Sequence, residues 1–308
     1  MATTTRRQFL QTSALLCAGT AFLPSFAFSK YQPKLSFSTL GCPDWSLKQF
    51  TDFAAANGYK GIELRGIQRE MDLTKAKDLS TPEARKETMK IMEDKGLLFV
   101  DLGSSATMHI TEPTERQKNM DEGKRFIDLA QQLNCPNVRV FPNNLPKENA
   151  QKAAAFELII NGILQLADHA KGSKVNVLVE SHGDLVHIND LEYVMKAIQH
   201  PNAGMIWDVC NMYEITKEDP IDAYHKLKPY IKHTHIKNAK LVGDKIQYVL
   251  LNQGDVPIFK AIDALVEGNY QGYFSFEWEK LWHPEIGEPE ITLADYPKAM
   301  SAHFEKRY

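Results

Sequence analysis

Val175-Asn176-Val177-Leu178-Val179-Glu180-Ser181-His182-Gly183-Asp184 is the stretch that decides the fold. Apolar residues, most of them β-branched, surround a single Asn, and this pattern predicts a buried strand. The strand ends at a carboxylate, Glu180, which is followed by small and polar residues. A buried strand that stops at a charged side chain places that side chain at the edge of a sheet.

Three later stretches repeat this design. Met205–Trp207 ends at Asp208, His233-Thr234 leads to His235, and Tyr273–Phe276 ends at Glu277. The positions 180, 208, 235 and 277 are separated by 28, 27 and 42 residues, and a βα unit takes about 30 residues. Each polar residue is therefore predicted to end a successive parallel strand. In a (β/α)₈ barrel such ends meet at one mouth, and two Glu, one Asp and one His there would form an O₃N site for a divalent metal.

The rest of the chain continues the alternation of short apolar runs and helical patterns. Earlier strands are expected at 35–41, 61–66, 97–102 and 138–141, and Ser46 and Thr81-Pro82 are typical helix starts. The long 42-residue interval contains 241–249, which predicts a small hairpin that turns at Gly-Asp and shapes the cavity. Eight βα units fit residues 30–308 without a linker or second domain, so we expect a single TIM barrel.

Residues 1–29 do not resemble part of this fold. Thr5-Arg6-Arg7-Gln8-Phe9-Leu10 is followed by a mildly apolar run to Leu23, too short and too polar to span a bilayer. Small residues before Lys30 offer a cleavage site. The pattern is typical of a twin-arginine export signal, the alternative being a basic tail. We therefore expect a periplasmic or secreted protein without stable membrane insertion.

Composition excludes several other classes of function. The net charge is −3, and removal of residues 1–29, with two arginines and no acid, would make it −5. No Lys/Arg run compensates for this charge, which argues against nucleic acid as a partner. Cys42, Cys135 and Cys210 would remain, and their number and contexts indicate neither a disulfide framework nor a Cys-x-x-Cys site.

The chain resembles the sugar phosphate isomerase/epimerase superfamily with its xylose isomerase-like barrel, almost from end to end. The motifs that carry the resemblance are Leu40–Pro43, Gly61–Arg65, Val179–His182, Trp207–Val209, His235–Lys237 and Ser275–Trp278. In that superfamily a Glu, an Asp, a His and a Glu on consecutive strands hold the metal. The resemblance implies Glu180, Asp208, His235 and Glu277 as ligands, with His235 preferred over His233.

The ligand set indicates the chemistry. Hard oxygen ligands suit Mn²⁺ or Mg²⁺, with Mn²⁺ as our first expectation, and the imidazole keeps Co²⁺ and Zn²⁺ open. A cation that binds two vicinal sugar oxygens polarises the carbonyl and stabilises an enediolate. In the related keto-sugar epimerases the first and last glutamates also act as base and acid. The resemblance therefore implies these roles for Glu180 and Glu277, the alternative for Glu277 being a ligand that transfers no proton.

Other polar residues are weaker candidates for contacts with a carbohydrate substrate, and ordinary packing explains each of them equally well. His182 and Lys237 each lie two residues beyond a ligand, on the same side of an extended chain. Glu63 is expected either in the mouth or paired with Arg65 or Arg139. The remaining candidates lie in loops that should border the mouth, and they are His109, Trp45, His283 and Trp282.

Three alternatives remain beside an isomerase or epimerase. A zinc endonuclease for abasic DNA would need more histidines, yet Asn211 stands three residues after Asp208, where one is required. A lyase or dehydratase for keto-glycosides or cyclitols begins with the same proton abstraction. A non-catalytic sugar-binding barrel is the third alternative. The sequence leaves open the particular sugar and whether the chain forms a homo-oligomer.

A phosphorylated substrate is not expected. Phosphate needs a cradle of backbone N–H groups or an Arg/Lys clamp. The ends of the last two strands lack Gly-x-Gly, and Glu279–Glu285 holds one lysine among acids and aromatics. The predicted export also argues against a phosphorylated substrate, because sugar phosphates are largely cytoplasmic. We predict an uncharged sugar, glycoside or cyclitol.

Overall fold

The computed structural model describes residues 31–243 and 245–307. The expected export signal, residues 1–29, lies outside the described residues, so it stays a prediction. In the described part of the chain, no helix has the length and apolar character needed to cross a membrane.

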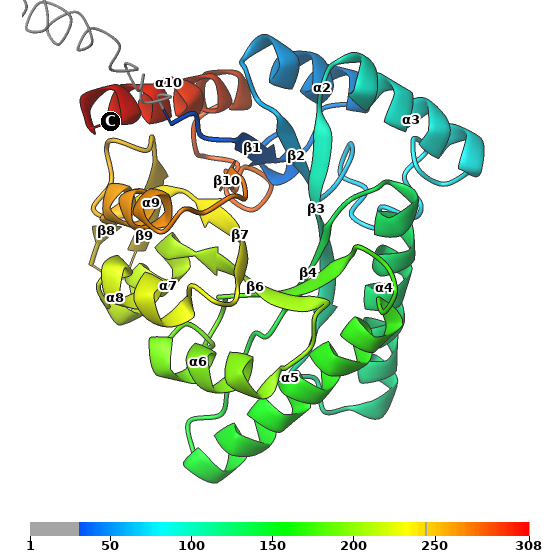
Figure 1. The fold of residues 1–308 in the computed structure, drawn as a ribbon, viewed down its shortest axis with the longest axis vertical. Helices are drawn as coiled ribbons and strands as arrows, with labels where there is room; N and C mark the ends of the chain where they lie inside the picture. Colours follow the sequence, from blue (N-terminus) through cyan, green and yellow to red (C-terminus); the bar gives the residue numbers. More distant parts are fainter. Residues whose placement is uncertain (1–30, 244, 308) are drawn as a thin grey trace, which may run out of the picture. The chain divides into compact units, whose positions relative to one another are not determined.

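Eight parallel strands form a closed barrel at the centre of the structure (Figure 1). Their order around the barrel is β1-β10-β7-β6-β5-β4-β3-β2, and β1 closes the ring by pairing in parallel with β10. The strands are β1 Leu35–Ser38, β2 Gly61–Leu64, β3 Leu98–Thr107, β4 Asn137–Phe141, β5 Asn176–Glu180, β6 Ala203–Asp208, β7 Ile231–Ile236 and β10 Phe274–Phe276. The predicted TIM barrel is confirmed.

Helices surround the strands (Figure 1). They are α2 Leu47–Ala56, α3 Pro82–Asp94, α4 Pro113–Gln132, α5 Asn149–His169, α6 Ile188–Ala197, α8 Pro220–Leu227, α9 Ile258–Glu267 and α10 Pro289–Arg307. Ser46 forms a capping box with Gln49 at the start of α2, and Thr81 caps α3 just before Pro82. These local signals were readable because capping depends on residues close together in the chain.

Three local features differ from, or add to, the predictions. β3 extends to Thr107, so Ser104 and Ser105 belong to the strand rather than to the loop after it. A 3₁₀ turn, η1 Thr39–Gly41, follows β1. A short helix, α7 Val209–Thr216, follows β6 at once, because the side chain of Asp208 caps it.

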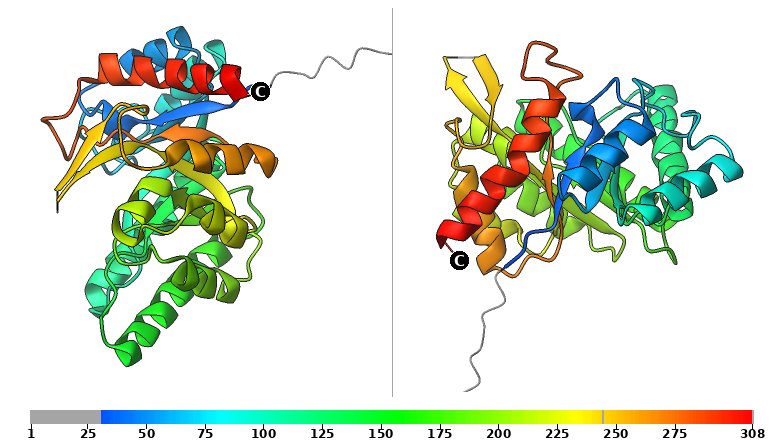
Figure 2. Two further views of the ribbon diagram at one scale, coloured as in Figure 1. Left: turned by 90° about the vertical axis from the view of Figure 1, so that its left-hand side faces the viewer. Right: turned by 90° about the horizontal axis from the view of Figure 1, so that it is seen from above.

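The predicted hairpin is confirmed as β8 Asn238–Val242 and β9 Lys245–Val249. Gly243, at its turn, has a φ of +61°, which glycine adopts without strain. Figure 2 shows the hairpin and the loop between β10 and α10 at the same end of the barrel. Side-chain contacts join them, since the rings of Tyr248 and His283 lie 5.1 Å apart.

The barrel interior is polar at the carboxyl end of its strands. Strand side chains alternate between the helices and the interior. Glu63, Arg139, Glu180 and His235 come from four strands and hydrogen-bond to one another across the barrel. They are almost completely buried. Buried charges persist only when they are paired, so this network positions each side chain closely.

Candidate metal centre

Four side chains converge at the carboxyl ends of β5, β6, β7 and β10. Glu180, Asp208, His235 and Glu277 each offer a ligand atom, and these atoms all lie within 4.8 Å of one another. His235 Nδ1 is 3.2 Å from Glu180 Oε1, 3.3 Å from Glu277 Oε2 and 3.6 Å from Asp208 Oδ2. The structure therefore brings together the four residues that the sequence singled out.

The backbone places these side chains side by side. Glu180 and Asp208 are the last residues of β5 and β6, and Glu277 directly follows β10. In the barrel order β5, β6, β7 and β10 are consecutive neighbours. The two oxygens of Asp208 make different contacts. Oδ1 accepts a hydrogen bond from the backbone N–H of Asn211 at 2.9 Å, whereas Oδ2 faces the cluster. Asn211 thus orients Asp208 through its backbone.

The donor set fits a divalent cation. Three carboxylates face one imidazole nitrogen, and all four side chains are nearly excluded from solvent. Burial lowers the pKa of His235, but the charges of Glu277, Glu63 and Glu180 outweigh burial and raise it well above its ordinary value. Acids that stabilise the positive charge of a protonated imidazole would also stabilise the positive charge of a metal ion at the same position. Carboxylate oxygens with one imidazole suit Mn²⁺, Mg²⁺, Co²⁺ or Zn²⁺.

Glu63 lies on the Nε2 side of His235, away from the three acids, and its contact with substrate stays a prediction. Its Oε2 accepts from His235 Nε2 at 3.1 Å, His233 Nε2 at 3.0 Å and Ser275 Oγ at 3.0 Å. The pairings with Arg65 or Arg139 that were the alternative are not the ones it makes. A carboxylate on Nε2 fixes the tautomer of His235 and leaves Nδ1 directed at the three acids. Glu63 is therefore a positioning residue.

Asp101 is a second buried acid near Glu63, opposite it in the register of β2 and β3. Its side chain is completely buried, and neither oxygen has a hydrogen-bond partner among the described residues. Burial and the nearby charge of Glu63 raise the pKa of Asp101 well above its ordinary value. Asp101 therefore holds its proton to a higher pH than an ordinary carboxyl group does.

Arg139 lies at the site, although the sequence suggested it only as a possible partner of Glu63. Its Nη1 donates to Glu180 Oε2 at 2.9 Å, and its guanidinium lies 3.9 Å from the centre of the Phe141 ring. Burial opposes ionisation of Glu180, but the charges of His235 and Arg139 outweigh burial and lower its pKa to about 2. The signal in the sequence was that Arg139, a charged residue, stands between two valines of a predicted buried strand.

Lys237 is buried among the acids. Its Nζ donates to Asp208 Oδ2 at 2.7 Å and to Glu277 Oε2 at 2.6 Å, and it forms an ion pair with Glu279 Oε1 at 2.7 Å. It also lies 5.8 Å from the centre of the Tyr248 ring on the hairpin. Burial lowers the pKa of Lys237, but the charges of Asp208, Glu277 and Glu279 outweigh burial and raise it well above its ordinary value. Glu279 was missed, although it lies two residues after Glu277 and so on the same side of the chain.

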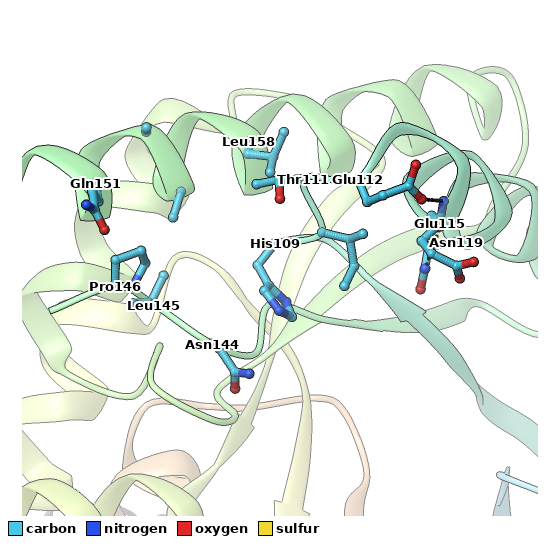
Figure 3. A pocket seen from close by; sticks show the side chains of 13 residues that line it. His109, Thr111, Glu112, Glu115, Asn119, Asn144, Leu145, Pro146, Gln151 and Leu158 are labelled. Carbon is cyan, nitrogen blue, oxygen red and sulfur yellow. Dashed lines mark hydrogen bonds between the residues drawn. The ribbon is translucent and has the colours of Figure 1, made fainter.

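His182 and His109 are not among the four side chains that converge. His182 Nδ1 bonds Asn143 Oδ1 at 2.8 Å, and its ring packs 4.6 Å from that of Phe141. His109 follows β3 and lines a pocket between α4 and α5, as Figure 3 shows. Their contact with substrate stays a prediction.

The loop aromatics are also peripheral. Trp45 packs against Phe53 of α2, with ring centres 5.0 Å apart. His283 packs against Tyr248, and its ring nitrogens lie 3.4 Å from Glu285 and 3.9 Å from Glu279. Trp282 is 55% exposed. The hairpin and the loop after β10 thus bring the ring of His283 close to Tyr248 and Glu279, two neighbours of Lys237. Trp282 is joined to the same group through its backbone N–H, which donates to Glu279 O at 3.0 Å.

Comparisons with known proteins agree with this fold. A curated 3-dehydroshikimate dehydratase from Bacillus anthracis is 25% identical over 199 residues, which cover 62% of this chain and 67% of the dehydratase. Among solved structures, the IolI protein with a bound zinc atom superimposes with a TM-score of 0.74 at 15% identity, over 89% of this chain and 99% of that one. A 3-keto-D-glucoside 4-epimerase from Escherichia coli has a TM-score of 0.65 at 12% identity, over 88% and 99% of the two chains.

A family model described as the xylose isomerase-like TIM barrel matches residues 51–295. This range includes all four candidate ligands, together with Glu63, Arg139 and Lys237. The chain therefore belongs to the xylose isomerase-like TIM barrel family.

Proposed function

We propose that this protein is a divalent-metal-dependent isomerase or epimerase for a non-phosphorylated sugar or sugar derivative. It would remove a proton from the carbon next to a carbonyl and return a proton to the substrate. The observation that carries the proposal is that Glu180 and Glu277 both bring a carboxylate oxygen close to His235 Nδ1, at 3.2 and 3.3 Å. Two carboxylates that converge on one centre are suited to such a proton transfer.

Glu180, Asp208, His235 and Glu277 would hold the cation, which supplies Lewis-acid polarisation of the substrate carbonyl when it is bound. Glu180 and Glu277 would move the proton. They have different partners, because Glu180 Oε2 is held by Arg139 whereas Glu277 Oε2 accepts from Lys237. The two carboxylates can therefore differ in basicity, as an acid and base pair requires.

Lys237 adds a donor beside the proposed base. Its ammonium lies 2.6 Å from Glu277 Oε2 and is shielded from water, with the side chain 1% exposed. A buried cation stabilises negative charge that develops on a substrate oxygen more strongly than an exposed one. Lys237 would thus stabilise the enediolate and protonate the substrate oxygen.

The loop after β10 supports a non-phosphorylated substrate. Lys280 is the one lysine in the stretch 279–285. Its Nζ donates to the backbone oxygens of Pro284 and Ile286 at 2.8 and 2.6 Å and to Glu288 at 2.9 Å. A lysine engaged in this way has its donors directed at its own loop rather than at a phosphate.

A dehydratase or lyase is the second candidate. The relative that is 25% identical is a 3-dehydroshikimate dehydratase. Elimination begins with the same proton abstraction, after which a group on the neighbouring carbon leaves instead of a proton returning. Lys237 would donate to that leaving oxygen.

The experiment is deuterium exchange from D₂O into a panel of free ketoses and keto-glycosides at saturating Mn²⁺. We expect Glu180→Gln and Glu277→Gln to fold normally and to lose exchange by at least about 10²-fold. Glu285→Gln is the matched control, because this exposed loop acid is not part of the cluster, and it should exchange like the wild type.

The product separates the two candidates. Inverted or isomerised sugar supports the epimerase, whereas an unsaturated product or a released aglycone supports the lyase. His235→Ala should lose the metal, as measured by elemental analysis. Wild-type exchange in both glutamine variants would show that the acid and base assignment is wrong, and wild-type protein that binds sugars without exchange would indicate a binding protein.

A further inference from the structure

Two buried arginines lie on the part of the barrel formed by β2, β3 and β4. Arg65 directly follows β2, and Arg139 lies in β4, whereas the four candidate metal ligands come from β5, β6, β7 and β10. Arg65 is 5% exposed and Arg139 is 2% exposed. Arg139 forms an ion pair with Glu180, but Arg65 forms none with any acid among the described residues.

The guanidinium of Arg65 has only neutral hydrogen-bond partners. Its Nη1 donates to the backbone oxygen of Gly103 at 3.2 Å, and its Nη2 donates to Ser105 Oγ at 2.8 Å. Burial and the charge of Arg139 lower the pKa of Arg65 to about 9, although the charge of Glu122 acts in the opposite direction. A buried charge is unfavourable unless it is paired. Arg65 is therefore a cation that an anionic ligand would stabilise.

Gly103 leaves the space in which the two arginine side chains lie close together. In the register of β3 and β4 it is the partner of Arg139. A Cβ atom at this position would lie 2.8 Å from Arg65 Cδ and 3.2 Å from Arg139 Nη2. The two like charges repel each other, and an anion that binds beside them would reduce this repulsion.

The arginine pair adjoins the metal centre and reaches solvent. Arg139 Nη1 lies 2.9 Å from Oε2 of the candidate ligand Glu180. The charges of Glu277 and Glu180 also act on the pKa of Arg65. Ser105, whose hydroxyl accepts from Arg65, is an exposed residue, so the guanidinium lies next to a solvent-accessible side chain. A substrate at the candidate ligands can therefore reach Arg65 with a second group.

We propose that Arg65 binds a carboxylate of the substrate, which is a sugar acid or cyclitol acid whose carbonyl end lies at the metal centre. This inference rests on the proposed function and names its substrate class, and it replaces the uncharged substrate that the sequence led us to expect. The planar fork of a guanidinium matches the two oxygens of a carboxylate. A doubly charged phosphate would be repelled more strongly by Glu180 and Glu277 than a singly charged carboxylate.

The test compares acids with their neutral amides of nearly the same shape. The probes are D-glucuronate with D-glucuronamide, and quinate with quinamide, each titrated by calorimetry into Mg²⁺-loaded protein. Binding is measured directly, so the readout does not depend on turnover. Arg65→Met removes the charge, and Arg65→Gln is a second neutral variant that can still donate to Gly103 or Ser105. Arg69→Met is the matched control, because Arg69 is an exposed arginine after the same strand and pairs with Asp44.

We expect the wild type to bind at least one acid about tenfold or more tightly than its amide, since a charge-assisted hydrogen bond contributes at least this much. Both Arg65 variants should lose the preference, and Arg69→Met should keep it. A wild type that prefers neither acid, whether from equal affinity or from no binding, would overturn the inference. So would a preference that persists without Arg65, because the carboxylate would then bind elsewhere, such as at the metal. Tighter binding of glucose 6-phosphate than of D-glucuronate would rule out a carboxylate as the preferred anion.

The result is separable from the proposed function. A preference for acids that depends on Arg65, in a protein that exchanges no proton into any sugar or sugar acid, supports the carboxylate site and contradicts the enzyme. Proton exchange into neutral sugars without a preference for acids does the reverse.

Discussion

Glu63→Gln tests how the metal centre is held in place. In the wild type the carboxylate oxygen Oε2 of Glu63 accepts from His235 Nε2 at 3.1 Å, opposite the Nδ1 that faces the acids. Glutamine keeps the shape but removes the charge, and its amide can direct a donor at Nε2 and disturb the tautomer. Loss of an outer partner of a ligating histidine typically costs 10- to 100-fold in metal affinity. We expect a loss in this range, or about 1.4 to 2.7 kcal/mol.

The assay is competition for Mn²⁺ or Zn²⁺ with a chelator of known affinity at pH 7. Asp101→Asn is the matched control. It lies opposite Glu63 in the strand register and makes no hydrogen bond to His235 among the described residues, so an amide there leaves the partners of His235 unchanged. Its metal affinity should equal that of the wild type.

A different result would refute the reasoning. Glu63, His233 and His235 also lie close enough together to hold a metal ion. If the ion were bound there, Glu63→Gln would abolish binding, while Asp208→Asn would leave it intact. Unchanged affinity in Glu63→Gln would show that Glu63 does not position His235.

Two further predictions follow from buried charges. Lys237→Met should bind metal as tightly as the wild type or more tightly, because Nζ no longer competes for Asp208 and Glu277, yet its turnover should fall by about 10²-fold. Chelator competition measures the metal affinity and steady-state kinetics measure the turnover, and a variant that loses metal would contradict the prediction. Asp101→Asn should be more stable than the wild type by a margin that grows with pH. The folded wild type holds a proton that the unfolded chain releases above about pH 4, so its stability falls by about 1.4 kcal/mol per pH unit until Asp101 ionises in the folded state. Urea unfolding of both proteins at pH 5 and pH 7 measures this margin, and a constant margin would contradict a raised pKa of Asp101.

The sequence by itself determined the repeating architecture and the four candidate ligands. Strand ends at Glu180 and Asp208 are local features, because each apolar run is followed directly by a carboxylate and then by small or polar residues or a helix start. The same holds for the Ser46 cap and the turn at Gly243. Regular intervals then made a parallel barrel the simplest arrangement, and a barrel brings the strand ends together whatever the details of packing.

Only the tertiary structure decided which polar side chains pair across the barrel. Glu63 and His235 are 172 residues apart, and their contact depends on strand stagger and side-chain rotamers that local patterns do not specify. The same reason explains why Glu279 was missed as a partner of Lys237. The pocket beside His109 arises from the packing of α4 and α5. Periodicity shows which face of an element is buried, whereas closure of the barrel determines what that face meets.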